Sequence, residues 1–159
     1  AYLAHSLNGT SWTMTPNLNV GSGSRYPVNV MYYNGLYIAS GGDSPGWIST
    51  SPDLVTWTAR TPNISNTYMS AASMSDSAAV IGGDTLAITS SSNGTTWTAR
   101  TSNLAGSITI WDIQWLNNSL FIATSTNGAL STSPDGATWT ARTSGFGSVH
   151  VRSVSYGAG

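Results

Sequence analysis

Apolar and polar residues along the chain alternate in short runs, a pattern that predicts β-strands joined by tight turns. The clearest unit extends from Ile108 to Thr143. Apolar, aromatic and β-branched residues fill its four runs, which cover 110–115, 120–124, 129–132 and 138–143. The Asn-Asn and Asn-Gly pairs between these runs accept the positive φ of hairpin turns. No window places apolar residues at i, i+3, i+4 and i+7, so the pattern predicts no helix.

The same four-run unit occurs twice more, over residues 28–61 and 68–101. Two strands, Tyr2–Ser6 and Ser11–Thr15, open the chain, and one strand, Val149–Tyr156, ends it. Four-stranded units of about 40 residues that stack on their neighbours are typical of a β-propeller. We therefore predict an all-β fold over 1–159, a single β-propeller or propeller segment of four-stranded antiparallel blades with one blade split between the termini. The repeats cover approximately 1–17, 26–62, 66–103 and 107–144, with 148–156 as the first strand of the split blade.

The split blade lacks a second strand, which leaves two ways to complete the ring. In the first, four blades close within the chain and one blade has three strands. In the second, the blades belong to a larger ring, made by a longer parent chain or by symmetric association of copies, which would also pair the exposed edge strands. Closure within one chain is the prediction that we place first.

A turn sequence that ends in tryptophan marks each repeat. Its copies are Ser6–Trp12, Ser51–Trp57, Ser91–Trp97 and Ser133–Trp139. Asp or Asn at the third position can accept backbone N–H groups, and glycine at the fourth takes a positive φ. We predict that the turns are structural and that each indole packs against a neighbouring blade. The residues concerned are Asn8 with Trp12, Asp53 with Trp57, Asn93 with Trp97, and Asp135 with Trp139.

This turn sequence resembles the Asp-box (BNR) motif of sialidase-like β-propellers, although every copy is one residue shorter than the usual Ser-x-Asp-x-Gly-x-Thr-Trp. The resemblance implies a turn between the third and fourth strands of each blade. It does not bring sialidase activity with it, because that family uses an arginine cluster, a Tyr–Glu pair and an acid–base Asp. This chain has no Glu, and Arg60, Arg100 and Arg142 fall at equivalent positions of successive repeats. The repeats are also similar to those of phage virion and bacterial surface proteins.

The composition argues against several function classes. Only 7% of the residues are charged and the net charge is −1, so nucleic acid is not an expected partner. The chain has no Cys, which excludes disulfides, thiolate zinc sites and a thiol nucleophile. Asp53 and Asp135 offer too few carboxylates for calcium, and His5 and His150 are too few for a metal site, so we expect no cofactor. No apolar run approaches the roughly 18 residues of a membrane span, so no membrane insertion is expected.

The loops that differ between repeats are the candidates for ligand binding. They join strands four to one and two to three, on the face opposite the tryptophan turns. Aromatic rings beside polar side chains are what sugar binding uses, although such rings can equally fill gaps between blades. The candidate ligand-binding residues are Tyr26, Asp43, Trp47, Tyr68, Asp84 and Trp111.

These features predict a non-catalytic binding module at an extracellular or virion surface. We expect it to recognise glycans or a cell-surface receptor, as a phage fibre or adhesin does. Two alternatives remain open. One is a structural subunit of a virion or extracellular filament that assembles through open blade edges as a homo-oligomer. The other is a degenerate sialidase-like glycosidase.

Overall fold

The computed structural model describes residues 2–15, 17–21, 25–42, 45–64, 68–106 and 109–157. Its strands form one two-stranded and three four-stranded antiparallel sheets. We call β1–β2 the N-terminal hairpin, and β3–β6, β7–β10 and β11–β14 blades 1, 2 and 3. The elements are β1 Leu3–His5, β2 Thr13–Thr15, β3 Tyr26–Tyr33, β4 Leu36–Gly42, β5 Trp47–Ser51, β6 Thr58–Arg60, β7 Met69–Met74, β8 Ala79–Gly83, η1 Asp84–Leu86, β9 Ala87–Ser91, β10 Thr98–Thr101, β11 Ile110–Leu116, β12 Leu120–Ser125, η2 Thr126–Gly128, β13 Leu130–Ser133 and β14 Thr140–Arg142.

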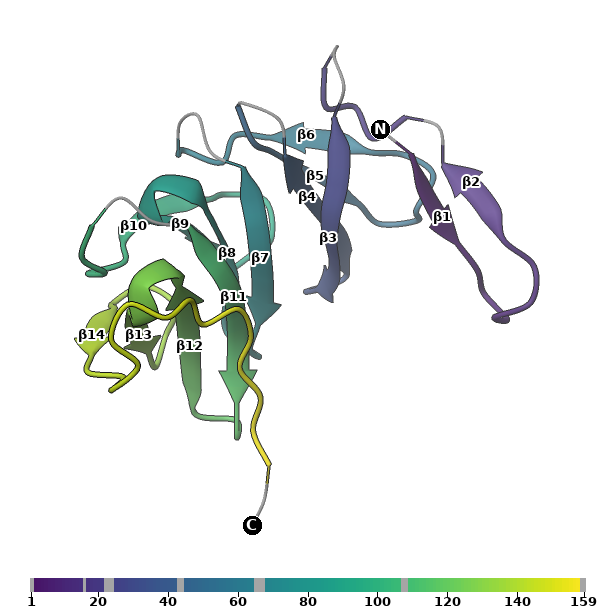
Figure 1. Cartoon of the computed structure of the whole chain (residues 1–159). Helices are drawn as coiled ribbons and strands as arrows, with labels where there is room; N and C mark the ends of the chain where they lie inside the picture. Colours follow the sequence, from purple (N-terminus) through teal and green to yellow (C-terminus); the bar gives the residue numbers. More distant parts are fainter. Residues whose placement is uncertain are drawn as a thin grey trace.

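Each blade is a meander in which strands adjacent along the chain are also adjacent in the sheet. The blades follow one another in an arc, with the hairpin at one end and blade 3 at the other (Figure 1). Along the inside of this arc the first strands contact their neighbours in order, β3 with β7 and β7 with β11. The predicted all-β propeller architecture of four-stranded antiparallel blades is therefore confirmed.

The apolar core is divided into three clusters, and each cluster joins two successive units of the arc. Trp97 of blade 2 packs with Ile38 and Ile48 of blade 1 and is 1% exposed. Trp139 of blade 3 packs in the same way on blade 2 and is 2% exposed. The tryptophan that ends each turn thus covers the preceding blade, where burial of its large ring stabilises the stack.

The first tryptophan does not follow this rule. Trp12 is 66% exposed, so the expectation that all four indoles pack between blades is wrong for this residue. The physical reason is that the N-terminal hairpin, which ends its turn with Trp12, lies at the end of the arc, where the described chain places no preceding sheet (Figure 1). Its equivalent Trp57 is buried because Leu3 and Leu18 lie against it.

The four turns share one hydrogen-bond network. In the turn of blade 3, the Asp135 carboxylate accepts the N–H groups of Ala137 and Thr138 at 2.8 Å each. The Ser133 hydroxyl donates to the same carboxylate at 3.0 Å and accepts the Gly136 N–H at 2.8 Å. The corresponding atoms around Asn8, Asp53 and Asn93 make equivalent bonds to their own turns. Asp and Asn are interchangeable at this position because only an accepting oxygen is required.

This network predicts how the stability depends on pH. The N–H group of Thr56 holds the pKa of Asp53 below its ordinary value, and that of Thr138 does so for Asp135. A carboxyl whose pKa is depressed by folding stabilises the protein above about pH 4, the pKa of an unfolded Asp, and this contribution is lost as the pH falls further. We expect the urea midpoint of the wild type to fall on acidification from neutral pH to about pH 3.

The double variant Asp53→Asn with Asp135→Asn is the matched control for this prediction. Asn already occupies the same position in two of the turns, so the variant retains the network at neutral pH. We expect its urea midpoint to change less between the two pH values. An equal loss in the wild type and the double variant would show that other groups cause the acid sensitivity.

One turn has leucine where the others have glycine. Leu54 has φ 64°, close to the 76° of Gly94 and the 72° of Gly136. A Cβ on Gly94 or Gly136 would meet the second strand of the preceding blade, at 3.3 Å from Ile38 and 2.6 Å from Val80. The N-terminal hairpin that precedes blade 1 has only two strands, so Leu54 has space there and is itself buried. A side chain that the preceding blade crowds in the turns of blades 2 and 3 thus fills the gap beside the hairpin.

The C-terminal segment, residues 149–157, lies where the sequence predicted the first strand of the split blade, but it forms no strand. The Asp112 carboxylate of β11 accepts the Val154 N–H at 3.0 Å, and the Val151 N–H donates to the Ser125 carbonyl at 3.2 Å. Side chains also link the other first strands, since the Asn29 amide donates to the Met69 carbonyl and the Ser70 hydroxyl donates to the Ile110 carbonyl. The segment therefore occupies the place next to β11 where a further first strand would lie, although it is not a strand itself. It lacks a ladder because no neighbouring strand pairs with it in the part of the chain that is described.

An asparagine after the last strand of the hairpin, of blade 1 and of blade 2 bonds to the next unit. The side-chain amide of Asn63 donates to the Trp97 carbonyl at 2.7 Å, and that of Asn103 to the Trp139 carbonyl at 2.6 Å. Asn19 makes the same bond to Trp57 at 3.2 Å. All three asparagines have positive φ, which Asn tolerates better than most residues. This contact was not predicted, although a Thr-x-Asn pattern occurs at the end of two of the fourth strands.

Candidate functional site

The residues predicted to bind a ligand lie at the start of the first strands or close to it. Tyr26 begins β3 and is exposed, and Tyr68 precedes β7. Asp84 begins η1, and Trp111 lies at the bulge of β11. Asp43 falls outside the described residues.

Three of these residues, Tyr26, Tyr68 and Asp84, come together across blades 1 and 2, and Asp84 also reaches blade 3. The Tyr68 ring packs directly on Gly42, where a Cβ would lie only 1.9 Å from the ring, and Gly42 pairs with Tyr26. The Asp84 N–H donates to the Tyr68 carbonyl at 3.0 Å, and the Asp84 carboxylate accepts the Thr109 hydroxyl at 2.8 Å. Asp84 thus uses its polar groups in contacts between blades.

Trp111 and Trp47 do not present free rings. The guanidinium of Arg152 lies 4.4 Å from the centroid of the Trp111 ring, a cation–π contact with the C-terminal segment. Trp47 is 4% exposed and packs with Ala39, Leu54 and Trp57. The expectation that Trp47 forms an exposed platform is corrected by this burial: its indole fills the space between the hairpin and blade 1.

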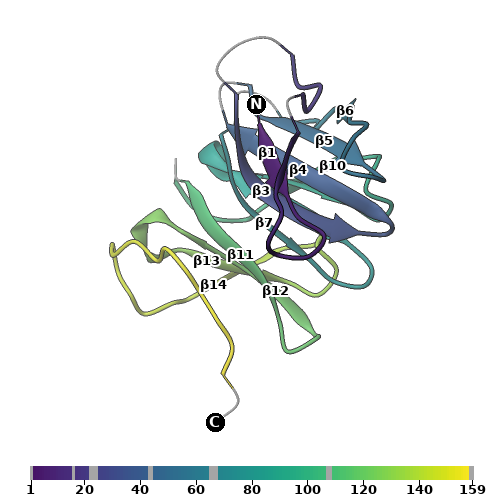
Figure 2. The same cartoon turned by 90° about the vertical axis from the view of Figure 1, so that its right-hand side faces the viewer.

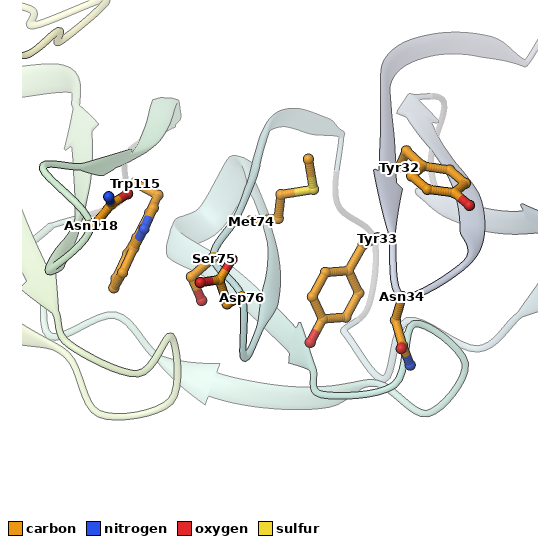
Figure 3. A pocket seen from close by; sticks show the side chains of 8 residues that line it. All are labelled: Tyr32, Tyr33, Asn34, Met74, Ser75, Asp76, Trp115 and Asn118. Atoms are coloured by element: carbon orange, nitrogen blue, oxygen red, sulfur yellow. The ribbon is translucent and has the colours of Figure 1, made fainter.

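A groove with suitable chemistry lies at the other end of the first strands, beside the tryptophan turns. It has a volume of about 380 Å³ and crosses all three blades. Aromatic and sulfur side chains alternate along it with amides, a hydroxyl and one carboxyl. The lining residues are Tyr32, Tyr33, Asn34, Met74, Ser75, Asp76, Trp115 and Asn118. Figure 3 shows Tyr33 and Trp115 on either side of Ser75 and Asp76.

The two rings that flank the groove are fixed by the blades. The Tyr33 hydroxyl donates to the Ser92 carbonyl of blade 2 at 3.0 Å, and burial raises the pKa of this phenol, which keeps it protonated. The Trp115 ring lies 4.6 Å from the ring of Phe121, and its backbone N–H donates to the Ser73 hydroxyl at 3.0 Å. A ligand would therefore meet aromatic surfaces that are already positioned, which lowers the entropic cost of binding.

The exposed groove residues provide both stacking surface and hydrogen bonds. Tyr32 is 53% exposed and Met74 is 39% exposed, so apolar surface remains accessible. Asn34, Asp76 and Asn118 are exposed at the turns between first and second strands. A second hollow of similar size is lined mostly by Ser and Thr, together with Arg100 and Asp135. No aromatic ring is among its described lining residues. The groove is thus the better candidate for a ligand.

The sequence contains a periodic signal for this groove. Tyr32, Met74 and Trp115 occupy equivalent positions near the end of the first strand, each directly before or close to a polar turn. A large side chain at this position in all three blades is a periodic feature, whereas the predicted binding residues came from loops that differ between repeats.

The three repeated arginines lie apart, as their spacing predicted. Each Nε donates to a hydroxyl on the third strand of its own blade, at 2.8 to 2.9 Å. The residues are Arg60, Arg100 and Arg142. Over the described ranges, no group of three or more His, Cys, Asp or Glu residues could hold a metal ion. In the same part of the chain, no helix is long and apolar enough to cross a membrane.

Comparisons with known proteins support the fold. A solved structure described as YCF48 bound to D1 peptide is similar to this chain, with a TM-score of 0.53 and 19% sequence identity. The match covers 80% of this chain and 46% of the other, so the chain spans less than half the length of that protein. Neither a protein-family model nor a curated protein matches the sequence.

Proposed function

We propose that the chain is a non-catalytic binding module whose groove, lined by Tyr32, Tyr33, Met74, Asp76 and Trp115, binds a neutral glycan of a cell or particle surface. The observation that carries this proposal is the alternation of fixed rings with amide and carboxyl groups across three blades. Aromatic rings stack on the C–H faces of a sugar, and the amides and carboxyl hydrogen-bond its hydroxyls.

The charge of the groove favours an uncharged ligand. Asp76 is the single ionisable acid among the lining residues, and no Arg or Lys is present to bind a sialic acid carboxylate. Hydrolysis of a glycosidic bond usually requires two carboxyl groups flanking that bond. One carboxyl among amides supports binding without turnover.

A glycan array with the intact chain tests this proposal. We expect binding to neutral glycans, and at least about a tenfold loss of affinity, equivalent to about 1.4 kcal/mol, in each of Tyr32→Ala and Asp76→Ala. Both residues are exposed, so these substitutions should leave the fold intact. The affinity would be measured by calorimetry with the best array ligand.

Tyr26→Ala is the matched control because Tyr26 is an equally exposed tyrosine at the opposite end of β3. We expect this variant to bind as the wild type does. If Tyr26→Ala abolishes binding while Tyr32→Ala does not, the ligand site lies on the face that the sequence analysis favoured. Release of sugar from a bound glycan would contradict the non-catalytic assignment.

A second candidate ligand is an extended, uncharged peptide. The solved structure with the similar fold is described as bound to a peptide, and Met74, Trp115 and Tyr32 would also accept apolar peptide side chains. Binding to an uncharged peptide library, lost in Tyr32→Ala and accompanied by no array signal, would replace the glycan with this ligand.

A further inference from the structure

Each interface between blades in this chain has two halves. One half is the tryptophan that ends a turn. The other is a pair of aliphatic side chains on the second and third strands of the preceding blade. Trp97 packs with Ile38 and Ile48, and Trp139 packs with Val80 and Ile88. Both halves are also present, unpaired, at the two ends of the arc.

The N-terminal hairpin carries the tryptophan half. Trp12 and Met14 point to the outer side of β2, and Ala4, which pairs with Met14, points the same way. Tyr2 lies two residues before Ala4 and is 65% exposed, while Met14 is 66% exposed. We call these four residues the hairpin face. A contiguous apolar cluster of this kind on a chain otherwise rich in Ser and Thr marks an interaction surface.

Blade 3 carries the aliphatic half. By register, Ile122 on β12 is equivalent to Ile38 and Val80, and Leu130 on β13 is equivalent to Ile48 and Ile88. In blades 1 and 2 these aliphatic pairs are buried under the tryptophan that follows, whereas Ile122 and Leu130 are half-buried. We call Ile122 and Leu130 the blade 3 face.

The N-terminal hairpin and blade 3, which carry these two faces, lie at opposite ends of the arc (Figure 1), and Figure 2 views the arc from the hairpin end. We propose that the hairpin face of one copy docks on the blade 3 face of a second copy, so that Trp12 covers Ile122 and Leu130. We assign this site to a second copy because its exposed Trp12 is the same kind of side chain as Trp97 and Trp139. Those two tryptophans already cover an aliphatic pair at both interfaces between blades.

This contact is heterologous, since two different faces meet. Copies would therefore add head to tail. The rotation between successive copies decides whether they close into a ring or form an open helical filament. The asparagine that bonds to the next tryptophan carbonyl in the earlier units is replaced by Gly145 after blade 3. The joint between copies therefore has one hydrogen bond fewer than the joints within a chain, and we expect association to depend on concentration.

Sedimentation velocity over a concentration series tests the proposal. We expect the wild type to self-associate and the variants Trp12→Asp and Leu130→Asn to remain monomers at the same concentrations. Each variant retains one intact face, so an equimolar mixture of the two should form a one-to-one dimer. Only a head-to-tail contact predicts this complementation.

Two controls keep the experiment interpretable. Tyr26→Ala removes an exposed ring away from both faces and should associate as the wild type does. Circular dichroism would verify that each variant is folded, and Ile122→Asn replaces Leu130→Asn if the latter unfolds. A wild type that stays monomeric at every concentration would overturn the proposal. So would a mixture that does not associate although both single variants are folded monomers, because that result indicates contact between identical faces.

Discussion

Trp139→Ala is expected to destabilise the protein by about 3–5 kcal/mol, the range for a large aromatic side chain removed from a packed core. Trp139 is 2% exposed and shares its cluster with Val80, Ile88 and Phe121. The substitution leaves a cavity between blades 2 and 3, and the strands on both sides cannot collapse into it without losing their ladders. The measurement is the urea midpoint, followed by circular dichroism at equal chain concentration.

Trp12→Ala makes the same chemical change at the equivalent position of the N-terminal hairpin. Since Trp12 is 66% exposed, we expect the free energy of unfolding to change by no more than about 0.5 kcal/mol. The pair of variants separates the contribution of the turn sequence from that of the preceding blade. Equal losses in the two variants would contradict the conclusion that the indoles stabilise the fold by covering the blade before them.

The glycines of the turns should show a graded response to Ala. Gly9, Gly94 and Gly136 have φ between 72° and 76°, so each Gly→Ala change incurs a similar conformational cost of about 1–2 kcal/mol. A Cβ on Gly9 would contact nothing within 4 Å, whereas on Gly136 it would lie 2.6 Å from the Val80 side chain. Overpacking adds about 1–3 kcal/mol at Gly136, so its total loss reaches roughly 2–5 kcal/mol.

Urea midpoints of the three single variants would test this order. We expect the smallest loss at Gly9, the largest at Gly136, and an intermediate loss at Gly94, where the nearest atom is 3.3 Å away at the end of the flexible Ile38 side chain. Because the three sites share φ and turn sequence, differences among them report on the preceding blade. Identical losses would mean that backbone conformation alone decides the cost.

The strands and turns could be predicted because their determinants are local. The same hydrogen-bond network forms in each turn from a serine, an Asp or Asn, and a residue with positive φ. The turn then sets where the third strand ends and the fourth begins. What the sequence could not distinguish is which ring is covered. Trp12 and Trp97 end closely similar turn sequences, but only Trp97 has a complete blade against it.

The site was harder to predict for a related reason. Trp47 and Trp111 are both aromatic residues without counterparts in other repeats, yet one fills the core and the other lies under Arg152. Their exposure depends on segments distant in sequence, the loop around Leu18 and the C-terminal segment. The groove was not predicted because Tyr32, Met74 and Trp115 are far apart in sequence. They form one surface only when the three blades lie side by side.

The bonds between the inner strands set a limit on how such a chain can change its order during evolution. Asn29 and Ser70 each donate to a carbonyl on the first strand of the next blade. Asp112 instead accepts an N–H group from the C-terminal segment. By register Asp112 is equivalent to Asn29, so a rearranged gene that placed blade 3 directly before blade 2 would bring the Asp112 carboxylate to the Met69 carbonyl, and two acceptors repel. The turns of the repeats are nearly identical, but these side chains on the first strands differ. Gene duplication or recombination that changed the order of the repeats would therefore lose some of these hydrogen bonds.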